Sequence, residues 1–81
     1  MELSEIARLI ESGLPGAKAD VTGGDGKYTA VVVSEAFAGK SMVEEHRMVY
    51  ATVKPHIESG ALHALTIKAF TPEEWAHQST G

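Results

Sequence analysis

His63 is the side chain of this sequence best suited to metal binding or to chemistry. It lies at the start of residues 62–70, whose alternating side chains predict a half-buried strand with His63, Leu65 and Ile67 on one face and Leu62 on the other. A neutral imidazole is a common metal ligand, and a true ligand usually donates its second ring nitrogen to a nearby acceptor. The alternative is a strand-end histidine whose ring is hydrogen-bonded to a backbone carbonyl.

No other group in the sequence offers a strong nucleophile. The chain has no Cys, so a metal site here must use His, Asp or Glu, or ligands from a partner. Ser34 and Ser41 have turn and capping positions. The run Gly23-Gly-Asp-Gly26 lacks the spacing of a phosphate-binding loop and joins two predicted strands. We therefore expect a protein that is not an enzyme.

The composition describes one small acidic domain. A chain of 81 residues buries only roughly 60–65% of its unfolded surface, which leaves little room for a deep cleft. The net charge is −4 and the seven Lys and Arg residues are scattered, which disfavours strong binding to nucleic acid. No apolar run approaches the roughly 20 residues of a membrane span, and the amino terminus is acidic. We expect a cytoplasmic protein without membrane association.

The first half of the chain is typical of a helix followed by a β-hairpin. Apolar residues at helical spacing predict a helix over residues 3–13, with Pro15 just past its end. Alternation predicts a short half-buried strand over residues 17–22, and β-branched side chains predict a second strand over residues 28–33. The glycines of Gly23–Gly26 supply the positive φ angles of a hairpin turn.

The second half is expected to place helices around a third strand. Residues 34–39 predict a compact connector or a single helical turn. A capping box at Ser41–Glu44 opens the longest helix, which Pro55 should end or kink. The third strand covers residues 62–70, and a second capping box at Thr71–Glu74 opens a short last helix. The apolar stripe of the long helix comprises Met42, His46, Val49, Val53 and Ile57.

These elements predict an α+β fold in the order α-β-β-α-α-β-α. The expected architecture is a three-stranded sheet covered on one face by helices. Residues 1–81 should form a single domain, in which residues 78–81 are a frayed tail.

Three segments of the sequence resemble the BolA family, in the order in which they occur there. They are Val33-Ser-Glu-Ala-Phe-Ala-Gly-Lys-Ser41, then Glu45-His-Arg-Met-Val-Tyr50, then His63-Ala-Leu-Thr-Ile-Lys-Ala-Phe-Thr-Pro-Glu-Glu-Trp75. The Gly-Asp-Gly turn also fits the family, and the short ending resembles its short bacterial-type members. The resemblance covers nearly the whole chain and implies a fold of the class II KH-like type.

The resemblance also implies a partner and a cofactor. BolA-like proteins pair with monothiol glutaredoxins that carry a Cys-Gly-Phe-Ser motif, and the heterodimer holds a bridging 2Fe–2S cluster. The glutaredoxin cysteine, glutathione and the histidine that opens the third strand, here His63, are its implied ligands. We expect no cofactor in the isolated chain, which should be a monomer or a weak homodimer. The implied function is cluster assembly, trafficking, or iron and redox sensing.

The resemblance is weaker at the second ligand. Relatives often carry His or Cys in the loop before the second strand, where this sequence has Lys27. A protonated lysine has no lone pair to give to a metal. Asp25 and Tyr28 are the other candidates in this loop, so the implied second-ligand loop comprises Asp25, Lys27 and Tyr28.

A partner surface is implied for the long helix and the carboxyl-terminal region. It comprises His46, Arg47, Lys68, Phe70 and Trp75. For His46, the alternatives are a buried packing residue and a residue that shapes the partner-facing surface near His63. The rival function is a KH-like nucleic-acid-binding transcriptional regulator. A binding module without a cofactor is a third reading, which the Lys27 departure supports.

Overall fold

The computed structural model describes residues 1–79 and has the predicted order of elements. The connector between the hairpin and the long helix is a single 3-10 turn, η1. The elements are α1 (Leu3–Gly13), β1 (Lys18–Gly24), β2 (Lys27–Val33), η1 (Glu35–Phe37), α2 (Met42–Glu58), β3 (Ala64–Phe70) and α3 (Pro72–Ser79). No helix within residues 1–79 has the length and apolar character needed to cross a lipid bilayer.

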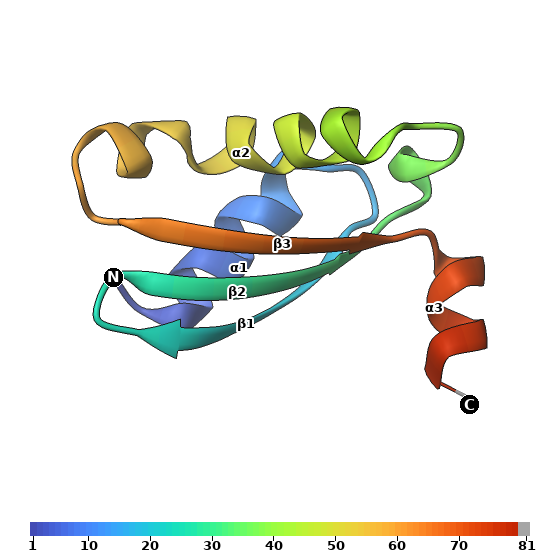
Figure 1. The fold of residues 1–81 in the computed structure, drawn as a ribbon, viewed down its shortest axis with the longest axis horizontal. Helices are drawn as coiled ribbons and strands as arrows, with labels where there is room; N and C mark the ends of the chain where they lie inside the picture. Colours follow the sequence, from blue (N-terminus) through green and yellow to red (C-terminus); the bar gives the residue numbers. More distant parts are fainter. Residues whose placement is uncertain (80–81) are drawn as a thin grey trace.

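The sheet has the strand order β1-β2-β3, with β2 in the centre (Figure 1). β1 and β2 are antiparallel and are joined by a tight turn, so Gly24 pairs with Lys27. β2 and β3 are parallel, and their register pairs Lys27 with Ala64 and Val33 with Phe70. Because parallel strands need a long crossover, α2 returns the chain from the end of β2 to the start of β3.

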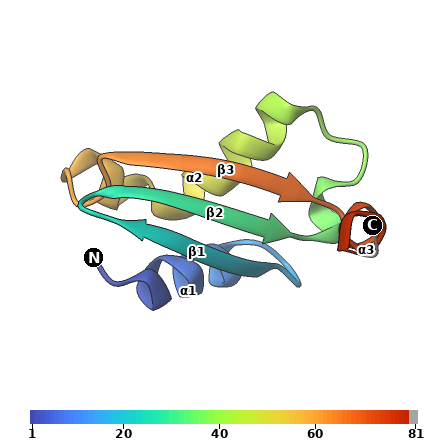
Figure 2. The same cartoon turned by 60° about the horizontal axis from the view of Figure 1, so that its bottom comes forward.

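The two long helices cover the same face of the sheet, as predicted. Figure 2 shows α1 beside β1 and α2 behind β3, with the opposite face of the sheet uncovered. The short helix α3 is placed differently, at the carboxyl ends of β2 and β3 (Figures 1 and 2). The fold is therefore two layers, with α3 as a projection at one end of the sheet.

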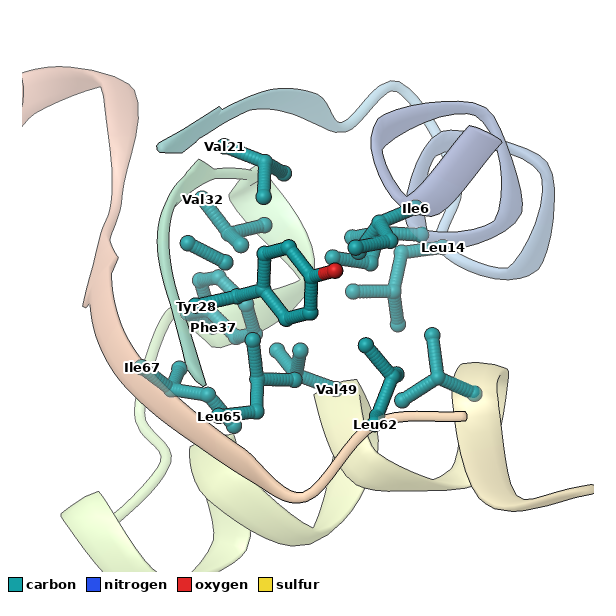
Figure 3. Close-up of a cluster of buried hydrophobic side chains, with 13 residues drawn as sticks. Ile6, Leu14, Val21, Tyr28, Val32, Phe37, Val49, Leu62, Leu65 and Ile67 are labelled. Atoms are coloured by element: carbon teal, nitrogen blue, oxygen red, sulfur yellow. The ribbon is translucent and has the colours of Figure 1, made fainter. Parts of the chain in front are cut away.

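The core lies between the sheet and these two helices (Figure 3). Alternate residues of β2 and β3 point into it, as period-two alternation requires. The buried apolar residues are Ile6, Ile10, Leu14, Val21, Tyr28, Ala30, Val32, Phe37, Val49, Val53, Leu62, Leu65 and Ile67.

The predicted face of Leu62 is wrong. Alternation placed it on the face opposite to Leu65, yet it is only 2% exposed and lies in the same core. The physical reason is that β3 begins at Ala64, so the strict alternation of an extended strand does not reach residues 62 and 63. His63 is exposed as a consequence, although counting by two places it on the core face.

Both predicted capping boxes are confirmed. In α2 the Glu44 N–H donates to Ser41 Oγ at 3.2 Å, and the Ser41 N–H donates to Glu44 Oε1 at 3.0 Å. In α3 the same pair of bonds joins Thr71 and Glu74, at 3.2 and 2.8 Å. Each box satisfies two backbone donors that a helix start or its flanking residue would leave unpaired.

The long helix differs from its predicted pattern at both ends. It does not end at Pro55 but runs to Glu58, since a proline in the last turn removes a single backbone donor. Gly60, with φ of 85°, follows its end. At the other end Met42 is 71% exposed although it belongs to the predicted apolar stripe. Figure 2 shows the start of α2 rising away from the sheet, which accounts for this exposure.

The carboxyl terminus also differs from the predicted frayed tail. α3 includes residues 78 and 79, the first half of that tail. Residues 80 and 81, the second half, lie outside the described residues.

Candidate metal-ligand site and partner surface

His63 lies directly before β3, beside the turn of the β1–β2 hairpin. Its backbone N–H and that of Ala64 both donate to the carbonyl oxygen of Gly26, each at 2.9 Å. The turn is formed by Asp25 and Gly26, whose φ angles of 54° and 79° are those of the tight turns that join antiparallel strands. Two segments 37 residues apart in the chain are thus held together by backbone hydrogen bonds.

The imidazole of His63 is exposed and packs against Gly26. Within residues 1–79, no hydrogen bond engages either ring nitrogen. The alternative in which the ring is bonded to a backbone carbonyl is therefore wrong for these residues. The expected acceptor for the second ring nitrogen is also missing from them. Because the residue is exposed and neither nitrogen is engaged within residues 1–79, the ring can bind a group brought by another molecule.

Of the three residues in the predicted second-ligand loop, Asp25 and Lys27 lie near His63 but Tyr28 does not point towards it. Asp25 is exposed at the tip of the turn, one residue from the Gly26 that contacts the ring. Lys27 begins β2 and pairs with Ala64, the neighbour of His63. Its side chain is exposed and belongs to the uncovered face of the sheet, since Tyr28 points into the core. Lys27 therefore adds a positive charge near the site and no metal-binding lone pair.

Tyr28 is removed from this loop by its burial. Its side chain is 7% exposed and lies in the core with its hydroxyl towards α1 (Figure 3). That hydroxyl donates to the backbone carbonyl of Met1 at 3.2 Å. We therefore exclude Tyr28 from the candidate ligands; β-strand alternation from Lys27 would have shown that the two side chains take opposite faces.

The described chain does not contain a complete metal site. Within residues 1–79, no group of three or more His, Cys, Asp or Glu side chains is close enough to hold a metal ion. His63 fits an iron–sulfur cluster as a single accessible nitrogen donor, the role that histidine has beside cysteine in mixed-ligand clusters. The remaining ligands would have to come from another molecule.

The predicted carboxyl-terminal surface lies at the other end of β3. Phe70, at the end of β3, lies seven residues beyond His63, which is roughly 20 Å at the usual rise per residue. The rings of Phe70 and Trp75 meet there, with centroids 5.3 Å apart and planes tilted by 52°. Lys68 is exposed and pairs with Val31 of β2. Trp75 remains 38% exposed.

A mainly apolar groove beside Trp75 was missed by the sequence analysis. It has a volume of about 450 Å³. Its lining includes Val31 and Val33 of β2, Lys18 and Asp20 of β1, and Pro72 and Trp75 of α3. Alternation along β2 does indicate that the side chains of Val31 and Val33 point away from the core. They become part of a groove only because α3 lies beside them.

His46 and Arg47 lie on the first half of α2, away from His63. His46 is partly buried, whereas Arg47 is exposed and lines a shallow groove with Tyr50 and Lys54. Since α2 starts near α3 and ends near the start of β3 (Figure 1), the hypothesis that His46 shapes the surface near His63 is wrong. Both residues belong instead to the α3 end of the molecule.

The carboxylates of Glu45, near the start of α2, and Glu74, in α3, repel each other. Partial burial raises the pKa of Glu45 first, the neighbouring Glu74 carboxylate raises it further, and His46 opposes both. The neighbouring Glu44 behaves in the opposite way, because hydrogen bonds from Ser41 lower the pKa of its carboxyl group. The pKa values of these two adjacent glutamates thus move in opposite directions, because Glu45 lies near the Glu74 carboxylate whereas Glu44 belongs to a capping box.

The fold and the His63 site define a class of small α+β proteins with an exposed histidine at the start of the last strand. The BolA-like protein family profile matches residues 10–74. The acid stress protein IbaG of Escherichia coli is 34% identical over 76 residues, which are 94% of this chain and 90% of that protein.

Solved structures agree with this relationship. A bolA protein homologue from Coxiella burnetii superposes with a TM-score of 0.85 at 31% identity, covering 94% of this chain and 97% of the other. The BolA domain of SufE1 from Arabidopsis thaliana gives a TM-score of 0.72 at 32% identity, covering 89% and 93%. The chain belongs to the BolA family.

Proposed function

We propose that this protein is a non-enzymatic partner of a monothiol glutaredoxin and shares a 2Fe–2S cluster with it through His63. The observation that carries the proposal is the exposed imidazole of His63: its backbone is hydrogen-bonded to the hairpin turn, and both ring nitrogens are unengaged within residues 1–79. The described chain lacks a complete ligand set. A shared cluster resolves this, because glutaredoxin cysteine and its bound glutathione supply the other donors.

The proposal fits a reducing compartment, and we place the protein in the cytoplasm. The chain would have no cofactor when isolated and would be a monomer or a weak homodimer. The cluster would serve assembly, trafficking, or iron and redox sensing. Support comes from membership of the BolA family and from the similarity to the BolA domain of SufE1, in which such a domain is part of another protein.

Lys27 makes His63 the donor on which this chain's contribution depends. With no lone pair on Lys27 and with Tyr28 in the core, Asp25 is the remaining oxygen donor of the turn. A cluster held here by one histidine should be released when that imidazole is protonated, since metal binding requires its neutral form.

The test is anaerobic co-purification with the host's monothiol glutaredoxin and glutathione, followed by visible circular dichroism. We expect a cluster spectrum that differs from that of the glutaredoxin homodimer and is changed by His63→Ala. The matched control is His56→Gln, which removes an imidazole from the last turn of α2 in the same half of the molecule. A complex whose spectrum is the same with and without His63 would refute His63 as a ligand, and a complex whose spectrum equals that of the glutaredoxin homodimer would refute the shared cluster.

The nucleic-acid reading retains one specific observation in its favour. Arg47 and Lys54 flank the exposed ring of Tyr50 on α2, a combination of cations and an aromatic side chain that suits single-stranded nucleic acid. The net charge of −4 opposes it. Binding to an oligonucleotide that weakens steeply with salt, and is lost in Arg47→Glu, would favour this function over the first.

A further inference from the structure

We propose that Gly26 is the positioning residue for His63: a side chain at residue 26 would displace the imidazole from its ligand orientation. This inference rests on the proposed function of His63. Its starting point is that the ring, within residues 1–79, has no hydrogen-bonded acceptor to orient it. The usual device for fixing a metal-binding histidine is thus missing from the described chain.

The ring instead occupies the space that a side chain at residue 26 would take. A Cβ atom at this position would overlap Cδ2 of His63 and lie 3.1 Å from its Cγ and 3.3 Å from its Cβ. These three atoms are the near edge of the imidazole and its attachment to the chain. The absence of a side chain at residue 26 therefore determines where the ring can lie.

The main chain of Gly26 also contacts the same histidine through hydrogen bonds. Its carbonyl oxygen accepts from the backbone N–H groups of both His63 and Ala64, at 2.9 Å each. With the backbone of His63 anchored in this way, its ring has only its own torsion angles to adjust. A new methyl group at residue 26 would consequently rotate the ring rather than shift the strand.

The chain offers a matched control for backbone strain. Gly26 has a φ of 79°, in the left-handed region, so any L-residue there carries a conformational cost besides the contact. Gly60 has a φ of 85°, and a Cβ atom built on it meets nothing within 4 Å. Gly60→Ala therefore reproduces the backbone cost of Gly26→Ala without touching His63.

The first readout needs no cluster. In the isolated wild-type chain we expect nuclear Overhauser effects between the Hδ2 proton of His63 and the α-protons of Gly26. They should disappear in Gly26→Ala, with a displaced ring resonance, and remain in Gly60→Ala. Wild-type spectra without these effects would overturn the inference.

The second readout is the cluster itself, in the complex with glutaredoxin and glutathione. Gly26→Ala should weaken cluster retention by about 10- to 100-fold, the range found when groups that orient metal ligands are removed. Gly60→Ala should retain the wild-type spectrum. Equal retention in the two variants would refute the positioning role, whereas a wild-type complex without a shared cluster would refute the proposed function alone. If Gly26→Ala does not fold, Gly26→Asn replaces it, since asparagine tolerates positive φ, with Gly60→Asn as its control.

Discussion

The two ends of β3 differ in how they are built. At the start of the strand, His63 is tied to the hairpin turn by backbone hydrogen bonds and lies on a glycine. At the far end, Phe70 and Trp75 pack ring against ring, and a mainly apolar groove remains open beside them. A metal ligand needs a fixed direction, whereas a protein-binding surface needs accessible apolar area. We therefore propose that the shared cluster is bound at the start of β3 and that cluster-free glutaredoxin docks at its far end.

The largest expected effect is on stability, at the His63 end. Leu62→Ala should lower the free energy of unfolding by about 2–5 kcal/mol, because it removes a side chain that is 2% exposed in the core just before His63. Urea denaturation measures this loss. The matched control is Leu3→Ala, whose side chain is 39% exposed and which should cost far less. Similar losses for the two leucines would mean that the segment before β3 is not anchored as described.

The next effect should appear in binding at the α3 end. Trp75→Ala should weaken association with cluster-free glutaredoxin by about 1–2 kcal/mol, as for an aromatic anchor in an interface. Isothermal titration calorimetry measures it. His63→Ala, at the opposite end of β3, should leave this cluster-free affinity unchanged. If His63→Ala is the more damaging variant, the assignment of docking to the α3 end is reversed.

A smaller effect should come from the cap of α3. Thr71→Ala removes the hydroxyl that accepts from Glu74, and such caps contribute about 1 kcal/mol to their helix. Since α3 packs mainly on the end of β3, hydrogen exchange should quicken in α3 alone. Ser41→Ala, the equivalent change in α2, should instead lower global stability. Faster exchange throughout the sheet of Thr71→Ala would show that α3 is integral to the core.

The smallest effect concerns Glu45 between α2 and α3. Burial and Glu74 raise its pKa, so its contribution to stability is most favourable at low pH and is lost as pH rises above the ordinary value of 4.5. Glu45→Gln should therefore stabilise the protein at pH 7, by no more than about 0.5 kcal/mol, and change nothing near pH 3. Denaturation at both pH values tests this. Glu44→Gln should have the opposite sign at pH 7, because the pKa of Glu44 is lowered.

The sequence predicted the elements well because their signals are local. Both capping boxes and the glycine-rich turn specify boundaries within a few residues of themselves, and the structure has them there. Leu62 was misplaced, since alternation holds only where the chain is extended and β3 starts at Ala64. Pro55 was expected to end or kink the long helix, but the helix runs three residues past it to Glu58.

The candidate site was predicted only in its central residue. His63 was found from its position before the strand, but its contact with Gly26 joins residues far apart in sequence and has no local signal. Tyr28 was included because it is next to Lys27, and the alternation of β2 sends it into the core. His46 was assigned to the wrong end because the direction of α2 relative to β3 depends on the crossover between parallel strands.

The most direct test of a His63-ligated cluster is pulsed electron paramagnetic resonance of the reduced complex. The chain would be labelled with ¹⁵N only in its histidines and combined with unlabelled glutaredoxin and glutathione. We expect a ¹⁵N coupling of the size typical of an imidazole bound to iron, which is lost in His63→Ala and kept in His56→Gln. A spectrum without this coupling, or one in which it survives His63→Ala, would contradict the assignment of His63 as a cluster ligand.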